Sequence, residues 1–290
     1  MGSSSAGIHW MRLALGAVLT AVCALSVHAI MLQGLGIPVP DMSLLSTGSR
    51  YPIQAVATLG LISLWQVASR RSRGSRVPGW VVLSVLAGML TETLIRKPFM
   101  EGYCTTAWIF AFVSNLGPVL AVIVSAVLII AVAPKLTSDL RRVAAAMVIS
   151  ALTMFVASPL IAAAMSPLLQ AMSNLAPQSE WCTLPYGADV LIPAYLTFAE
   201  PVVACFATAA LVWDGLSGSR GVRLLQFTLI IVAIKKQLLT PILYALVAKV
   251  GVGSALLSEG QFALEAVALA VLTGLSWEWS SGSRLMRNVT

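Results

Sequence analysis

Eight apolar stretches constrain the fold of this chain more than any other feature of its sequence. A helix needs about 20 apolar residues to cross the hydrocarbon core of a bilayer. Charged side chains make up only 10% of the 290 residues, whereas a soluble domain contains roughly a quarter. We therefore predict an all-α fold, a polytopic membrane bundle of about eight transmembrane helices that forms a single integral membrane domain over 1–290. The predicted spans are 13–35, 51–68, 78–98, 106–133, 142–171, 190–213, 224–249 and 254–277.

The basic residues predict how this bundle is oriented. Cytoplasmic loops carry an excess of Lys and Arg, and twelve such residues fall on one side of the predicted bundle. These are Arg12, Arg70, Arg71, Arg73, Arg76, Lys135, Arg141, Arg142, Arg220, Arg223, Arg284 and Arg287, against Arg50, Arg96, Lys97 and Lys249 on the other side. We expect a bacterial cytoplasmic (inner) membrane with both termini in the cytoplasm. The net charge of +7 is thus explained by orientation, and no nucleic-acid partner is expected.

The first apolar stretch has a second interpretation. Arg12, the apolar run 13–25 and the small residue Ala29 together fit a signal peptide with a cleavage site. Cleavage there would leave seven helices in the same orientation. We favour a transmembrane span because apolar sequence continues beyond Ala29 to Leu35.

Two of the four cysteines fall in loops that the orientation places outside the cytoplasm. In an oxidising periplasm Cys104 and Cys182 are candidates for a disulfide between two outward loops, and the alternative is two unpaired thiols. Cys23 and Cys205 lie within predicted spans and are interpreted as small packing residues.

The two halves of the chain show signs of an internal duplication. The tripeptide 74–76 matches the tripeptide 218–220, so the halves are offset by 144 residues. The same offset places Ser114 on Ser258, and a slip of one residue brings Pro98 onto Pro241. The repeats would cover 12–133 and 142–277, with four helices each and an axis along the membrane normal. Chance matches are the alternative, because apolar segments draw on few residue types.

Ionisable and amide side chains inside the predicted spans are the candidates for a functional site. A charge at a helix centre costs about 2.5–3.5 kcal/mol to insert, so such groups should face protein or water. Ser258, Gln261 and Glu265 share one helix face, which adds an amide to the set. For Glu92 the alternative is a local salt bridge to Arg96, four residues later. The candidate substrate- or ion-binding residues are Glu92, Glu200, Lys235, Lys236, Gln261 and Glu265.

Prolines accompany these residues. Pro201 directly follows Glu200, Pro241 follows the lysine pair, and Pro118 lies in the fourth span. A proline inside a helix removes one backbone hydrogen bond, so we predict kinks that free carbonyl groups near the charges. Kinks that serve packing alone are the alternative, since membrane helices tolerate them.

These features favour one class of function among three. A transporter or permease, proton-coupled through Glu200 or Glu265 and meeting a small polar or anionic substrate through Lys235 or Lys236, fits the buried charges best. A non-catalytic subunit or assembly factor would use them to contact a membrane protein partner. An intramembrane enzyme acting on a lipid is the third class. The chain has two histidines and no C-x-x-C or Walker motif, so we expect no metal and no cofactor, and the same absences weigh against an enzyme.

Overall fold

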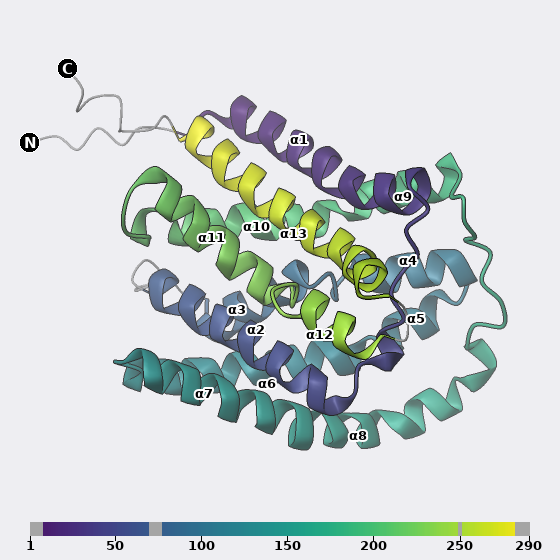
Figure 1. The fold of residues 1–290 in the computed structure, drawn as a ribbon. Helices are drawn as coiled ribbons and strands as arrows, with labels where there is room; N and C mark the ends of the chain where they lie inside the picture. The colour runs from purple at the N-terminus through teal and green to yellow at the C-terminus, as the bar shows by residue number, and fades with distance from the viewer. Residues whose placement is uncertain (1–7, 70–76, 249–250, 282–290) are drawn as a thin grey trace, which may run out of the picture.

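The computed structural model describes residues 8–69, 77–248 and 251–281, and within them every regular element is a helix (Figure 1). The predicted all-α class is therefore confirmed. Five helical runs are long and apolar enough to cross a membrane, which indicates a membrane protein. They are Trp10–Gly34, Trp108–Lys135, Asp139–Ala171, Ala188–Gly215 and Val252–Ser280.

Thirteen α-helices make up the described chain, several of them joined end to end by a turn or a π-helical segment. The first six are α1 (Trp10–Ala29), α2 (Thr47–Ala68), α3 (Gly79–Leu90), α4 (Arg96–Thr105), α5 (Trp108–Ser114) and α6 (Leu116–Val132). The others are α7 (Asp139–Ala151), α8 (Ser158–Ala171), α9 (Ala188–Thr197), α10 (Ala199–Val212), α11 (Arg220–Ile234), α12 (Thr240–Val247) and α13 (Val252–Ser280).

The other three predicted spans are not simple apolar helices. The stretch 51–68 falls within the single helix α2, which carries Gln54, Thr58 and Gln66 among its apolar residues. The stretches 78–98 and 224–249 are both broken, because α3 ends at Leu90 and α11 at Ile234 before a new helix begins. Each of these two predicted spans is therefore a pair of helices separated by five residues that are not helical, 91–95 and 235–239.

The prolines near the candidate residues lie in the first turns of helices. Pro98, Pro118 and Pro201 are each the third residue of their helix, and Pro241 is the second residue of α12. The first turn of a helix has no carbonyl partner for its N–H groups, so proline costs little there. A break precedes Pro241, whereas Pro118 and Pro201 follow one-residue interruptions inside the continuous runs Trp108–Lys135 and Ala188–Gly215.

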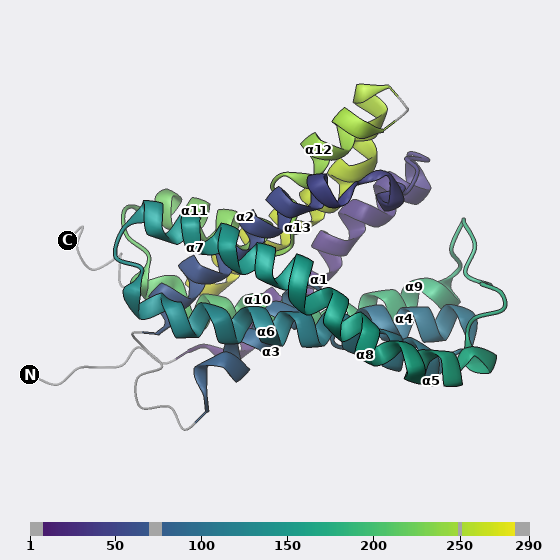
Figure 2. The same cartoon turned by 90° about the horizontal axis from the view of Figure 1, so that it is seen from below.

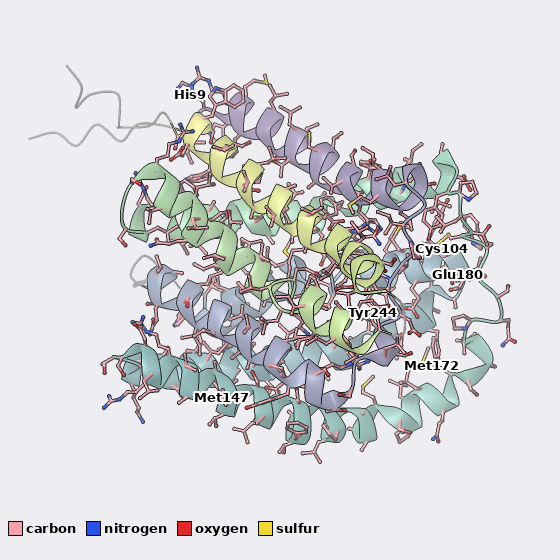
Figure 3. The ribbon with its side chains drawn as sticks, viewed as in Figure 1. His9, Cys104, Met147, Met172, Glu180 and Tyr244 are labelled. Carbon is pink, nitrogen blue, oxygen red and sulfur yellow. A yellow bond between two sulfur atoms is a disulfide. The ribbon has the colours of Figure 1, made fainter. Side chains whose placement is uncertain are left out.

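Both ends of the described chain lie at the same end of the bundle (Figure 1). Figure 3 shows His9 at this end, whereas Cys104 and Glu180 lie at the opposite end. The described basic residues at the ends of α1, α6, α7 and α11 lie near the termini, as the alternation of the helices requires. The predicted basic residues at 70–76, Lys249, Arg284 and Arg287 lie outside the described residues, as does the tripeptide 74–76 of the proposed repeat.

The helices pack closely near the termini and diverge at the far end. Figure 2 shows α12 with the adjoining ends of α1 and α13 on one side, and α4, α5, α8 and α9 on the other. In the packed part α1 lies along α13, α2 lies between α7 and α11, and α10 contacts α3. Phe198, Phe227 and Leu83 are fully buried there. The site described below lies where the two groups of helices separate.

The contact between α1 and α13 depends on a glycine, and this gives a first prediction. A Cβ atom added at Gly16 would lie 2.6 Å from the Cβ atom of Ser276, which is fixed to the backbone of α13. We expect Gly16→Val to lower the free energy of unfolding by about 1–3 kcal/mol through overpacking. Thermal unfolding of the purified protein measures this. Gly253→Val is the matched control, since no heavy atom lies within 4 Å of a Cβ atom added there. Equal effects of the two substitutions would show that α1 does not pack this closely.

Candidate functional site

The two broken helix pairs have the same backbone geometry. In each break one residue other than glycine adopts a left-handed conformation, Glu92 with φ 61° and Lys236 with φ 66°. Three backbone hydrogen bonds close each break, and every donor and acceptor in the second lies 144 residues after its counterpart in the first. The bonds run from Thr91, Glu92 and Thr93 to Ala87, Met89 and Gly88, and from Lys235, Lys236 and Gln237 to Ile231, Ala233 and Val232.

Glu200 closes the first break. Its carboxylate accepts hydrogen bonds from the backbone N–H groups of Leu94 and Ile95, both at 3.1 Å, and from that of Arg96. These N–H groups lie at the start of α4 and have no carbonyl partner. The carboxylate satisfies their hydrogen bonds, and its negative charge interacts favourably with the positive end of the helix dipole. Glu200 is 5% exposed. The structure thus places this predicted ion-binding residue as a cap on a helix start.

The second break lacks such a cap. The position 144 residues before Glu200 is Val56, which has no acceptor group. The backbone N–H groups of Leu238, Leu239 and Thr240 accordingly have no acceptor among the residues that the structure describes. The two breaks share a backbone geometry and differ in how their polar groups are satisfied.

A cluster of four charges joins the two breaks. Glu92 forms ion pairs with Arg96 on α4 and with Lys235 at the end of α11. The Lys235 Nζ atom also lies 3.4 Å from the Leu90 carbonyl oxygen and 3.9 Å from Glu265 Oε1. The side chains of Lys235 and Glu265 are 7% and 5% exposed. Two carboxylates and two cations balance, which is how buried charges are tolerated.

Lys236 lies in different surroundings from its neighbour. It lines the same cavity as the ion-pair cluster, together with Arg50 and Lys97. All three side chains are exposed, and no carboxylate lies within ion-pair distance of any of them in the described part of the chain. Unlike Lys235, Lys236 therefore has no acidic partner among the described residues.

Two connected cavities occupy the region where the helices diverge. One of about 780 Å³ is lined by both breaks and by residues of α2, α6, α8 and α13. The other, of about 740 Å³, lies between α1, α4, α9 and the loop that follows α8. They share His28, Glu92, Arg96 and Lys97. Both volumes are typical of sites for small molecules.

The predicted polar face of the last span contributes only one residue to these cavities. The Ser258 Oγ and Gln261 Nε2 atoms donate to the Pro38 carbonyl oxygen at 2.8 and 3.2 Å. Gln261 is fully buried. These two residues hold the segment after α1 against α13, whereas Glu265, one helical turn further on, lines the larger cavity.

Five further residues belong to this region although the sequence did not single them out as candidates. Arg50, Arg96 and Lys97 had been counted as outward basic residues, and His28 had been counted only as one of the two histidines. Glu259 is 1% exposed, lies beside Gln237 and has one oxygen without a hydrogen-bond partner among the described residues. Of the five, Arg96 and Lys97 carry a sequence signal, because they directly precede Pro98 after the first break.

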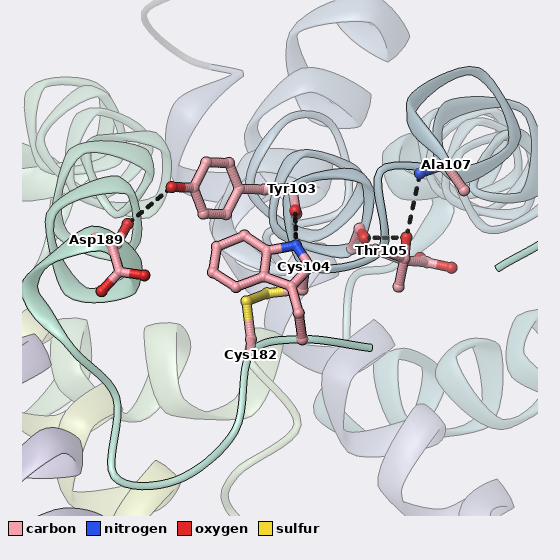
Figure 4. Close-up of a disulfide and its surroundings, with 8 residues drawn as sticks. Tyr103, Cys104, Thr105, Ala107, Cys182 and Asp189 are labelled. Atoms are coloured by element: carbon pink, nitrogen blue, oxygen red, sulfur yellow. Dashed lines mark hydrogen bonds between the residues drawn. A yellow bond between two sulfur atoms is a disulfide. The ribbon is translucent and has the colours of Figure 1, made fainter. Parts of the chain in front are cut away.

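A disulfide joins Cys104 at the end of α4 to Cys182 in the loop after α8 (Figure 4). The loop is held further because the Trp181 backbone N–H and its indole Nε1 donate to the carbonyl oxygens of Cys104 and Tyr103 at 3.0 and 2.9 Å. The Tyr103 hydroxyl donates to the Asp189 carbonyl at 3.0 Å (Figure 4). The loop therefore forms one wall of the smaller cavity, at Gln178 and Glu180.

The chemistry available in the two cavities is that of cations, carboxylates and one imidazole. Within 8–69, 77–248 and 251–281 no three His, Cys, Asp or Glu side chains lie together as metal ligands would. Comparisons with protein-family models, with curated protein sequences and with solved structures found no match.

Proposed function

We propose that this chain is a multi-pass secondary transporter of the bacterial inner membrane that moves a small polar or anionic solute. The observation that carries the proposal is that two broken helices meet at a balanced charge cluster on the wall of a cavity of about 780 Å³. Broken helices whose free backbone groups and charges face a cavity are typical of transporter binding sites. Charges inside a membrane are costly and are retained where they serve such a site.

In this proposal the chain crosses the membrane eight times. The pairs α3–α4 and α11–α12 each cross once as a broken helix, and α2 crosses between two of the apolar runs. Both termini lie in the cytoplasm, supported by the excess of basic residues at their end of the bundle. The disulfide at the other end supports an oxidising periplasm there.

The two halves are proposed to be a duplication with a central site. The ends of α2 and α10, at Ala68 and Val212, differ by 144 residues. The same difference separates the ends of α3 and α11 and the starts of α4 and α12. Packing also supports the duplication. Helix α2 in the first half contacts α11 in the second half, and α10 in the second half contacts α3 in the first half. The interface between parallel repeats is where substrate sites lie in several transporters.

Lys235 is the residue proposed to move between two ion-pair partners. It is paired with Glu92, and Glu265 lies 3.9 Å away on a different helix. In the proposed cycle Lys235 moves from Glu92 to Glu265 as the two halves shift, while Glu92 stays paired with Arg96. Neither arrangement therefore leaves a bare carboxylate in the membrane.

Uptake by proteoliposomes tests this proposal. Vesicles containing the purified protein are given a proton gradient and incubated with a small-molecule extract of the expressing cells, and retained compounds are identified by mass spectrometry. We expect at least one compound to accumulate above the level in empty vesicles. Lys236→Gln should reduce that accumulation, because Lys236 lines the cavity and has no structural partner.

Lys135→Gln is the control, since Lys135 is exposed at the end of the bundle opposite the cavities. No accumulation above empty vesicles, with the protein shown to be folded, would overturn the proposal. Accumulation that does not depend on Lys236 would place the transport path elsewhere.

A further inference from the structure

The larger cavity has more positive than negative charge on its walls. Its charged lining consists of Arg50, Arg96, Lys97, Lys235 and Lys236 against Glu92 and Glu265, and His28 is the further titratable side chain. Glu92 pairs with both Arg96 and Lys235, and Glu265 is the second carboxylate close to Lys235. Once this cluster is balanced, three cations remain, namely Arg50, Lys97 and Lys236.

The three remaining cations come from three different elements and share one space. Arg50 is on α2, Lys97 on α4 and Lys236 in the break before α12. The charges of Arg50 and Lys97 both act on Lys236. Within the described residues, the one side-chain hydrogen bond of these three cations runs from Arg50 Nη2 to the Met42 carbonyl oxygen at 2.8 Å, so no carboxylate compensates their charges there. Like charges held together in a largely apolar region raise the energy of the empty state, and an anion removes that cost.

The rest of the wall combines apolar side chains with hydroxyl and amide groups such as Ser125 and Gln54. Leu45, Ile53 and Ala57 lie on one side, with Met154 and Phe262 elsewhere in the lining. A simple inorganic ion would leave this surface in contact with water. A ligand that pairs two or more negative groups with a carbon skeleton uses both parts of the cavity.

We infer that this cavity binds a soluble organic anion carrying at least two negative oxyanion groups, carboxylates or phosphates, through Arg50, Lys97 and Lys236. The inference rests on the proposed function and names the substrate class of the same site. Guanidinium and ammonium groups are the usual partners of such oxyanions, and charge-assisted hydrogen bonds are stronger than those between neutral groups.

Binding to the purified full-length protein in detergent tests this inference without any transport. Succinate, citrate and inorganic phosphate serve as probes, with chloride at equal ionic strength as the reference, and thermal unfolding and calorimetry give the readouts. We expect succinate or citrate to raise the Tm in a saturable way, whereas saturable binding of inorganic phosphate alone would overturn the inferred organic anion. Lys236→Gln should weaken that binding about tenfold or more. The triple variant Arg50→Gln, Lys97→Gln, Lys236→Gln should lose it, and Lys135→Gln should retain it.

Absence of saturable binding of all three probes overturns the inference, as does binding that persists in the triple variant. The triple variant should fold, because none of its three side chains has an ion-pair partner to lose, and its own Tm checks this. A lipid headgroup offers the same chemistry, so nanodiscs with and without phosphatidylglycerol form a second arm. Stabilisation by that lipid alone, dependent on the three cations, would replace the soluble anion by a lipid.

The outcomes also separate this inference from the proposed function. Anion binding without accumulation of any compound in vesicles would leave the site intact and overturn transport. Accumulation of uncharged compounds without anion binding would leave transport intact and overturn the substrate class.

Discussion

Replacing Lys235 with methionine is expected to lower the free energy of unfolding by about 3–5 kcal/mol, because the substitution leaves a buried carboxylate without its cation. Lys235 bridges the two breaks through its ion pair with Glu92, and it is the cation nearest to Glu265. Arg96 still pairs with Glu92 in the variant, so Glu265 bears most of the loss. Thermal or denaturant unfolding of the purified protein measures the change. The double variant Lys235→Met, Glu265→Gln should recover part of it.

Lys236→Met is the matched control for this prediction. The substituted residue is the next in the chain, has the same side chain and also lies at the break. Because Lys236 has no carboxylate partner and faces two other cations, its loss should leave the stability unchanged or slightly raised. Equal destabilisation by the two substitutions would contradict the assignment of Lys235 alone to the charge cluster.

Glu200→Ala is expected to be the other strongly destabilising substitution, by about 3 kcal/mol or more. The carboxylate satisfies three backbone N–H groups at the start of α4, and an unsatisfied buried group costs about 1–3 kcal/mol. Glu200→Gln keeps one acceptor oxygen and should lose roughly half as much. Loss of folded protein from the membrane and a lower Tm are the measurements.

The control for Glu200 is Glu180→Ala, which removes an exposed carboxylate from the loop after α8 and should change stability by less than about 0.5 kcal/mol. A transport defect in Glu200→Gln with an unchanged Tm and membrane level would return Glu200 to the ion-binding role that its sequence position suggests. The structural role predicts the reverse order, with stability lost first.

Helix content could be predicted from the sequence because the length of an apolar run depends on local composition alone. The breaks could not. Glu92 and Lys236 adopt a left-handed backbone conformation although neither is glycine, so the residue type at these positions does not predict the turn. The prolines did carry a signal, but a proline in a first turn and a proline in a kink look alike in sequence.

The site was predicted in part for a similar reason. Deep charges had to find partners, and Glu92, Lys235 and Glu265 do lie together. Glu200 caps a helix through a contact with residues more than a hundred positions earlier in the chain. A local sequence pattern cannot predict which acidic residue makes such a contact. Arg50 and Lys97 were assigned to outer loops, since counting basic residues by side does not reveal a cavity that opens there.

The left-handed residues in the two breaks also supply a criterion for recognising relatives of this chain. A β-branched residue in that conformation costs about 1–3 kcal/mol, whereas glycine or asparagine adopts it more readily. Homologous sequences should therefore avoid Val, Ile and Thr at the positions of Glu92 and Lys236, and should place a proline a few residues later in each half. A search for this paired signature would detect relatives by backbone geometry where overall sequence similarity has been lost.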